Sequence, residues 1–278
     1  MNVIFPTRDL GDMRVTALSD GYLEIGFNML SNVDENECET IQRGARIDEI
    51  NAVHINVFLI QQNGRNILID SGAGGVKGWG GKLVANLGRL NIQPEDIHAV
   101  LLTHAHPDHI GGLLNADGEA VFSQAELIVS SDEFHYLESD ENFAAVSDRV
   151  KGNFLLARSI FKKYQKKIRL IDNGEVFPGI FALPLKGHTP GHTGYRIEGE
   201  KSSLLIWGDI VHFPHIQLAR PDVAIAFDHD PHLAAETRSR LLNAVSSDKI
   251  LIGGMHFGEQ GFGYIEKCES GYGIVHID

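Results

Sequence analysis

The sequence has few of the residues that would build a disulfide scaffold, a membrane anchor or an exported protein. Its 278 residues include two cysteines, Cys38 and Cys268, which lie far apart and outside any CxxC pattern. A disulfide framework and a cysteine-built zinc site are therefore not expected, and a reducing, cytoplasmic setting is predicted. No apolar stretch approaches the roughly 20 residues that cross a bilayer. The N-terminus also lacks the basic leader and apolar region of a signal peptide.

Positive charge is scarce as well. The chain carries 24 lysine and arginine residues against 37 aspartate and glutamate residues, which gives a formal net charge of −13. Such a field repels phosphate backbones, so we expect a small-molecule substrate as the partner and neither nucleic acid nor a membrane. The one basic cluster, at residues 162–169, falls in a helix-like stretch and is interpreted as a solvated helix face.

The remaining composition is that of a globular protein with a substantial core. Hydrophobic residues make up 43% of the chain and charged residues 22%, which is ordinary for such a protein. No repeat, low-complexity segment or linker interrupts the sequence, so we predict one domain over residues 1–278. Within it, the polar and irregular residues 26–52 are predicted to form a loop or cap. A homodimer is compatible with these features.

Strand-like and helix-like runs succeed one another in two halves. The runs at residues 57–60 and 66–70 flank Asn63-Gly64, a pair that supplies the positive φ angles of a tight hairpin turn. Strands followed by helix–strand alternation predict an α+β fold in which two sheets pack face to face with helices outside. Further strands are predicted at residues 14–19, 99–103, 126–130, 179–185, 194–197, 203–207 and, closing the series, 249–253. Helices are predicted at residues 82–90, in the region between the strand 126–130 and about residue 167, and from the N-cap Asp230 onward.

The segment that decides the functional prediction lies at residues 103–109, with the sequence Thr-His-Ala-His-Pro-Asp-His. It directly follows a buried-looking strand, and loops at the edge of a rigid sheet are where sites are usually built. Neutral imidazoles and carboxylates are the ligands suited to zinc and related divalent metals. His104 and His106, two apart on an extended chain, point the same way and can share one ion. Asp108 and His109 can then serve a second ion beside it.

Four ligands undersupply two metal ions, and further donors follow downstream. His188 lies in a glycine-punctuated loop after a strand, Asp209 ends another strand, and His256 follows the last predicted strand. Taken alone, either histidine could instead be a hydrogen-bonded core residue that binds no metal, and Asp209 could be a turn residue. Their recurrence at strand ends favours one shared site, where Asp209 could bridge two ions. His192, four residues after His188, is interpreted as a partner that orients a neighbour.

Four motifs, in this order, resemble the metallo-β-lactamase-fold superfamily. They are His-Ala-His-Pro-Asp-His-Ile-Gly-Gly from His104, Gly-His-Thr-Pro-Gly-His from Gly187, Gly-Asp ending at Asp209, and the late His256. The similarity extends over residues 50–260. The resemblance implies a four-layer αββα sandwich of the α+β class, with two mixed sheets, outer helices and a metal site along one sheet edge.

The resemblance also implies which residues bind which metal ion. The first ion would be bound by three imidazoles, those of His104, His106 and His188. The second would be bound by Asp108, His109 and His256, with Asp209 bridging both ions. We expect two divalent ions, zinc in the first instance, with manganese or iron as alternatives.

Two positions exclude other branches of this superfamily. His109 stands where class B β-lactamases usually have another residue, so antibiotic hydrolysis is not expected. His106 stands where flavodiiron members have a glutamate, so a redox di-iron centre is not expected either. Features of the RNA-processing branches are missing, and the acidic charge argues against them too.

Similarity at residues 80–87, 211–217 and 227–238 points to the branch of N-acyl homoserine lactonases and methyl parathion hydrolase-like enzymes. Many lactonases of this type carry a tyrosine three residues after the bridging aspartate, and His212 stands there instead. His212 is therefore a candidate donor to a substrate oxyanion, with simple packing as the alternative. An apolar substrate pocket has candidates, each with core packing as its alternative, in Phe27, Met29, Trp79, Phe213, Phe257 and Phe262.

Together these features predict a binuclear metal-dependent hydrolase in which a bridging hydroxide attacks an ester, lactone or phosphotriester. A bound metal can lower the pKa of water from about 15.7 to near 7, so the metals would supply most of the nucleophile activation. Asp108 would pass a proton to the leaving group. The alternatives are a glyoxalase II-like thioesterase, an iron-dependent sulfur dioxygenase with a single iron, and a metal-binding module without turnover.

Overall fold

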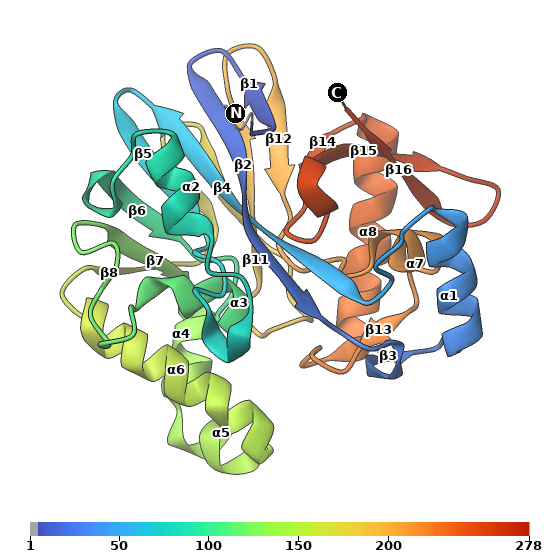
Figure 1. Ribbon diagram of the computed structural model, residues 1–278, viewed down its shortest axis with the longest axis horizontal. Coiled ribbons are helices and arrows are strands. Elements are labelled where there is room, and N and C mark those ends of the chain that lie inside the picture. The colour runs from blue at the N-terminus through green and yellow to red at the C-terminus, as the bar shows by residue number, and fades with distance from the viewer. Residues whose placement is uncertain (1–4, 278) are drawn as a thin grey trace.

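Two β-sheets pack face to face at the centre of the fold (Figure 1). The computed structural model describes residues 5–277. Residues 1–4 of the N-terminus, where no signal peptide is predicted, lie outside the described part. The first sheet has seven strands, in the order β1 (Thr7–Asp9), β2 (Met13–Glu24), β4 (Ala52–Gln62), β5 (Arg65–Ile69), β6 (Ile97–Leu101), β7 (Glu126–Ser130) and β8 (Ile168–Ile171). The second also has seven, in the order β16 (Tyr272–His276), β15 (Phe262–Lys267), β14 (Leu251–Gly253), β12 (Ser203–Ile206), β11 (Thr193–Glu198), β10 (Ile180–Pro184) and β9 (Gly174–Phe177).

Both sheets are mixed, as predicted. In the first sheet the strands pair antiparallel from β1 to β5 and parallel from β5 to β8. In the second sheet β12 and β14 are parallel, and the other neighbours are antiparallel. A short antiparallel pair, β3 (Leu30–Ser31) with β13 (Ala224–Ile225), lies beside them.

The alternation of side chains along β4 shows how the sequence builds the layers. Phe58 and Ile60 point between the two sheets, whereas Val57 and Leu59 point to the opposite face, because successive side chains of a strand alternate. That outer face of the first sheet is covered by helices that include α2 (Leu83–Arg89) and α6 (Asp148–Tyr164), and the outer face of the second by α8 (Pro231–Asp248) (Figure 1). The predicted αββα sandwich is confirmed.

The remaining α-helices of the described residues are shorter than α6 and α8. They are α1 (Glu35–Gly44), α3 (Pro107–Ile110), α4 (Ser131–Glu138), α5 (Asp140–Ala145) and α7 (Pro214–Ala219). Within residues 5–277, no helix has both the length and the apolar character needed to span a bilayer.

Two local signals in the sequence correspond to the observed structure. Asn63 and Gly64 have φ angles of 49° and 76° in the turn between β4 and β5, which is the backbone that a tight hairpin requires. Asp230 caps α8, because its side chain accepts a hydrogen bond of 3.0 Å from the backbone N–H of Leu233. Pro231 follows at the first helical position, where its missing N–H is not needed.

Residues 26–52, predicted to form a loop or cap, contain the helix α1. Asp34 caps this helix by accepting a hydrogen bond of 2.8 Å from the backbone N–H of Glu37. The helix contacts α7, and its Cys38 is buried in an apolar cluster with Ile216. The polar composition of the segment reflects its exposed face, while a few buried side chains hold the helix in place.

Seven strands were not among the predicted elements: β1, β3, β8, β9, β13, β15 and β16. The strand at residues 251–253 does not close the series, since β15 and β16 continue the second sheet beyond it. Four of them, β1, β8, β9 and β16, lie at the edge of a seven-stranded sheet, where pairing on one side leaves side chains partly exposed. Such strands lack the strong apolar alternation by which central strands are found.

The space between the sheets should be sensitive to loss of volume. Phe58 and Phe262 meet there edge to face, with 5.4 Å between ring centroids, and both are fully buried. We expect Phe262→Ala to lower the free energy of unfolding by about 3–5 kcal/mol, because it leaves a cavity, as urea unfolding would measure. The matched control is Leu155→Ala at a side chain that is 58% exposed, with an expected change within about 0.5 kcal/mol. Equal losses in both variants would contradict the assignment of Phe262 to the core.

Candidate metal centre

Side chains from both sheets meet at one edge, where their strands end. His104 and His106 follow β6 of the first sheet, and the short helix α3 begins directly after them. His188, Asp209 and His256 follow β10, β12 and β14 of the second sheet. These three strands run in the same direction, because β10 and β12 are both antiparallel to β11, and β12 is parallel to β14. The loops that follow them therefore reach the same edge.

The first group of donors consists of three imidazoles. The Nδ1 atom of His106 lies 3.0 Å from Nε2 of His104 and 2.9 Å from Nε2 of His188. Three ring nitrogens thus converge on one point from two sheets. His104 and His188 are buried, and His106 is partly buried at the wall of a cavity.

The second group contains Asp108, His109, Asp209 and His256, whose donor atoms lie within 4.8 Å of one another. Asp209 Oδ1 is 3.2 Å from Nε2 of both His109 and His256. Its other oxygen, Oδ2, faces the first group, at 3.5 Å from His188 Nε2. Asp209 therefore lies between the two groups, with one oxygen toward each.

Several of these atoms are buried without a hydrogen-bond partner in the described structure. They are Nε2 of His109, Nε2 of His256 and Oδ1 of Asp209. A buried polar atom without a partner is costly, so the close approach of such atoms calls for an additional group between them. Imidazole nitrogens and carboxylate oxygens are ligands for zinc and related ions. The residues present fit a metal centre.

The protonation states of His104, His106 and Asp209 suit metal binding. Burial lowers the pKa of His104 well below its usual value and that of His106 to about 3, so both rings stay in the neutral form that binds metal. Burial opposes protonation of His109, but its carboxylate neighbours, led by Asp209, outweigh that effect and raise its pKa, so a metal ion that binds here would displace a proton from this ring. Burial would raise the pKa of Asp209, yet the surrounding imidazoles hold it well below its usual value. Asp209 is therefore ionised.

A further layer of hydrogen bonds orients the imidazoles. Nδ1 of His109 is 2.7 Å from Oδ2 of Asp70, and Nδ1 of His188 is 2.8 Å from Oδ1 of Asp228. Nδ1 of His256 bonds at 2.6 Å to the backbone carbonyl of residue 54. In each case the nitrogen turned away from the centre is held, so Nε2 points inward and its lone pair is available.

His192 does not belong to either donor group and holds the backbone at Asp209. Its Nδ1 donates to the carbonyl of Leu185 at 2.8 Å, and its Nε2 accepts from the backbone N–H of Asp209 at 2.9 Å. The adjacent Gly208 has a φ of 62°, and a Cβ atom there would come within 2.4 Å of His192 Nε2. Only glycine allows this close approach, so His192 orients a neighbour in this structure.

His212 lies against both donor groups. Its Nε2 is 3.1 Å from Asp209 Oδ2, and its ring stacks on that of His256 with 5.2 Å between centroids. Its Nδ1 is buried without a hydrogen-bond partner in the described structure, and the residue lines the cavity. The backbone N–H groups of His212 and Phe213 both donate to the side chain of Gln217, which holds this turn.

A cavity of about 450 Å³ opens onto the donor groups. Most of its exposed lining is apolar, from side chains that include Leu23, Ile25, Trp79, Val150, Phe154 and Phe227. Of the six apolar candidates in the sequence, Trp79 lines the cavity, whereas Phe27, Met29, Phe213, Phe257 and Phe262 pack in apolar clusters.

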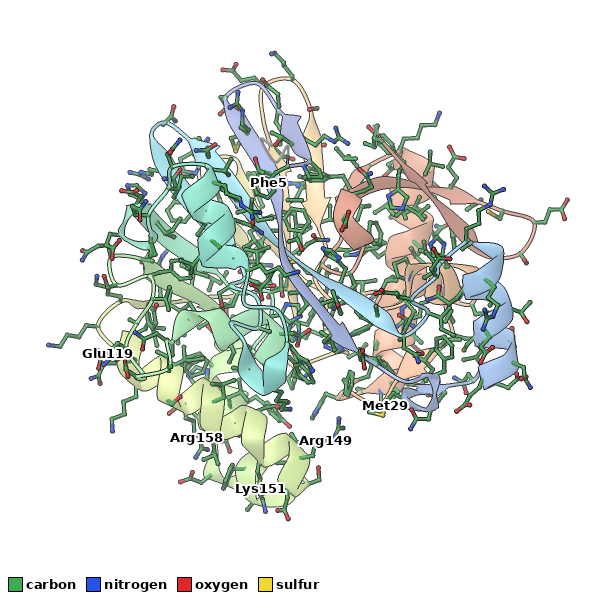
Figure 2. The ribbon with its side chains drawn as sticks, in the orientation of Figure 1. Phe5, Met29, Glu119, Arg149, Lys151 and Arg158 are labelled. Atoms are coloured by element: carbon green, nitrogen blue, oxygen red, sulfur yellow. The ribbon has the colours of Figure 1, made fainter. Side chains whose placement is uncertain are left out.

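Arg149 ties together two walls of this cavity. Figure 2 labels it near the start of α6, and its guanidinium donates to the carbonyl of Ala226 at 3.0 Å. The same guanidinium lies 5.3 Å from the ring centre of Phe227, a distance at which cation–π attraction operates. Lys77 also lines the cavity, so two cationic side chains stand beside an otherwise apolar space.

The structure brings together all seven predicted ligands and His212. Sequence reasoning did not single out Asp70, Glu133 or Asp228 as parts of the site, although each is hydrogen-bonded to a predicted ligand or to its loop. Asp70 ends a predicted strand and could have been found by the rule that selected Asp209. The other two carry no local signal, because their partners lie tens of residues away in the sequence.

Comparison with known proteins identifies the family. The model of the metallo-beta-lactamase superfamily matches residues 50–254, which is well over half of the chain. The chain therefore belongs to the metallo-beta-lactamase superfamily, as its motifs predicted.

Curated relatives point in the same direction. An N-acyl homoserine lactonase of Bacillus cereus is 30% identical over 125 residues, or 45% of this chain and 42% of the relative. N-acyl homoserine lactonase AiiA of Bacillus thuringiensis subsp. kurstaki is 28% identical over 172 residues, or 62% of this chain and 60% of the relative. The chain thus matches less than two thirds of the length of either protein.

Solved structures share the fold over nearly the whole chain. Hydrolase AbOPH of the beta lactamase superfamily has a TM-score of 0.91 at 30% identity, covering 99% of this chain and 97% of AbOPH. AidC, a dizinc quorum-quenching lactonase, has a TM-score of 0.90 at 24% identity, with the same two coverages, and this likeness shows the fold alone. Taken together, the family and its members support a metal-dependent hydrolase.

The hydrogen bonds of His192 should stabilise the folded protein even without bound metal. We expect His192→Phe to lower the free energy of unfolding, because the carbonyl of Leu185 and the N–H of Asp209 lose their partner. Each orphaned group costs about 1–3 kcal/mol, which chemical denaturation of the metal-free protein would measure. His232→Phe on the exposed face of α8 is the matched control, with an expected change within about 0.5 kcal/mol. If the two variants unfold alike, His192 does not hold this backbone.

Proposed function

We propose that this chain is a binuclear metal-dependent hydrolase that acts on an ester, a lactone or a phosphotriester. The observation that carries the proposal is the position of Asp209, a buried carboxylate with one oxygen toward each of two groups of donors. In this assignment one ion is held by His104, His106 and His188, and the other by Asp108, His109 and His256, with Asp209 shared. Zinc is the first choice of metal, with manganese and iron as alternatives.

Two divalent ions bound here would supply an activated water as the nucleophile and would polarise the carbonyl or phosphoryl oxygen under attack. The chain's own residues then have separate tasks. Asp108 lines the cavity, and although burial opposes it, the imidazole of His109 lowers its pKa, so it is a carboxylate in the resting site. It can accept the proton of the attacking water and pass it to the leaving group.

His212 is placed to stabilise the negative charge that develops on the substrate oxygen. Its ring lines the cavity beside Asp209, at the position where many lactonases of the resembling branch have a tyrosine. A positioned N–H donor in a site shielded from water stabilises an oxyanion strongly. The apolar wall of the cavity suits a substrate with an apolar portion, and the similarity to N-acyl homoserine lactonases is consistent with a lactone.

A glyoxalase II-like thioesterase is a second candidate because of Lys77 and Arg149. A thioesterase that acts on an anionic thiol conjugate needs basic residues near the site, and these two line the cavity. A panel of lactones, phosphotriesters, simple esters and anionic thioesters distinguishes the two candidates. If the first proposal holds, lactones or phosphotriesters should be hydrolysed with a higher kcat/KM than the anionic thioesters.

The shared carboxylate gives a direct test of the metal assignment. We expect the wild-type protein to bind two metal ions per chain, and Asp209→Ala and His109→Ala to bind about one or fewer. Asp209→Ala removes the ligand that both ions share, and His109→Ala removes a ligand of the second ion. Elemental analysis of dialysed protein measures the content, and circular dichroism checks folding. Asp172→Ala, at an exposed position, should bind as the wild type does. Folded Asp209→Ala and His109→Ala proteins that retain two ions and full activity would refute the assignment. A wild-type protein that binds a single iron ion would instead favour the sulfur dioxygenase.

The role of His212 can be separated from packing. We expect His212→Phe to lower kcat by about 10²- to 10³-fold with a smaller change in KM, because the ring is kept while its N–H donor is lost. His212→Tyr places a hydroxyl donor at the same position, so it should recover part of kcat on lactones. Steady-state kinetics on the best substrate of the panel measures both. Unchanged kcat in His212→Phe would assign the residue to packing.

A further inference from the structure

Glu133 is a buried carboxylate that no part of the proposed chemistry uses. It lies on α4 and is 2% exposed. Its Oε1 accepts a hydrogen bond of 3.0 Å from the backbone N–H of Ala105. Its Oε2 accepts one of 2.6 Å from the hydroxyl of Thr189 and one of 3.0 Å from the backbone N–H of Gly191.

All three partners of Glu133 are donors, so the environment selects a side chain with acceptors at both ends. Burial raises the pKa of Glu133, and the hydrogen bonds from Thr189, Ala105 and Gly191 counteract that rise. A glutamine of the same shape would turn an NH₂ group toward at least one N–H or O–H donor. The approach is also close, since a Cβ atom at Gly191 would come within 2.2 Å of the backbone nitrogen of Glu133.

The partners of Glu133 are sequence neighbours of the first donor group. Ala105 lies between His104 and His106 in the loop after β6, and Thr189 follows His188 in the loop after β10. These loops belong to different sheets. A single carboxylate therefore joins the two loops whose three imidazoles converge, and it does so from the side of the substrate cavity, which Glu133 also lines.

We propose that Glu133 is a positioning residue that sets the separation of His106 and His188, and hence the geometry of the first metal position. This inference rests on the proposed function, because it takes the three imidazoles as ligands. Glu133 acts through the backbone of the two loops. Its loss should change how tightly and in what geometry a metal ion is held there.

Asp20 provides a matched control of the same chemical kind. It is a fully buried carboxylate of β2 that accepts backbone hydrogen bonds from Ala73, Gly81 and Leu83, at 2.9, 2.9 and 2.8 Å. Its partners lie in the glycine-rich segment 72–81 and at the start of α2, neither of which carries a predicted ligand. Asp20→Asn should therefore destabilise the protein as Glu133→Gln does and leave the metal centre unchanged.

The experiment compares Glu133→Gln with Asp20→Asn in the full chain, with three readouts. We expect both variants to lower the melting temperature of the metal-free protein. Glu133→Gln alone should weaken zinc binding, by about 10- to 100-fold as for other residues that support a ligand, in a competition titration with a chelator. It alone should also alter the visible spectrum of the cobalt-substituted protein, which reports the ligand geometry. Thr189→Val, which removes one donor to Glu133, should change both metal readouts in the same direction by less, and provides the test if Glu133→Gln does not fold.

Wild-type zinc affinity and an unaltered cobalt spectrum in Glu133→Gln, or in Thr189→Val if Glu133→Gln does not fold, would overturn the inference, since Glu133 would then support the fold alone. Failure of the proposed function has a different signature. In that case the wild-type protein would bind metal but would turn over no substrate of the panel. Zinc affinity and the cobalt spectrum of Glu133→Gln would still decide whether Glu133 positions the ligands.

Discussion

A buried carboxylate surrounded by imidazoles is the feature on which the rest of this structure depends. Asp209 is removed from water, and a charge in that position is tolerated only when opposite charge or hydrogen-bond donors surround it. Its oxygens face imidazoles that come from both sheets, while its backbone N–H is held by His192. The pairing of the sheets and the assembly of the centre are therefore one event. Strand ends that failed to meet would leave Asp209 and its partners buried and unpaired.

The imidazoles are themselves held by a layer of acceptors that the fold delivers from other elements. Asp70 at the end of β5, Asp228 before α8 and a carbonyl in β4 each take the outward nitrogen of a different ring. Glu133 supports the loops rather than the rings. The donors are thus oriented before any ion arrives, and a preorganised set loses little freedom on binding. The apolar cavity wall beside them keeps the local dielectric low, which strengthens each of these interactions.

Sequence alone predicted the parts of this arrangement that have a local signal. The cluster at residues 103–109 is detectable because its spacing is set by one extended segment, and His188, Asp209 and His256 because each follows a strand. Asp228 and Glu133 were not predicted because their roles come from contacts with residues 28 to 58 positions away in the sequence. The same reason explains the elements. Central strands and the capped helix α8 were predicted, whereas edge strands such as β16 and the polar helix α1 derive their order from neighbours that composition does not reveal.

The layout of the cavity has a consequence for how its specificity can change. Phe227 lines the cavity, and the next residue, Asp228, orients His188, so a substitution that reshapes this loop also disturbs a predicted ligand. Val150 and Phe154 line the opposite side from α6, a helix that carries no predicted ligand and is inserted between β7 and β8. Arg149 connects the two walls through Ala226 and Phe227. Because the ligands follow strands of the sandwich while α6 packs on its outside, the shape of the α6 wall can vary with the donor geometry preserved. The same holds for the wall formed by Leu23, Ile25 and Trp79, whose segments also carry no predicted ligand.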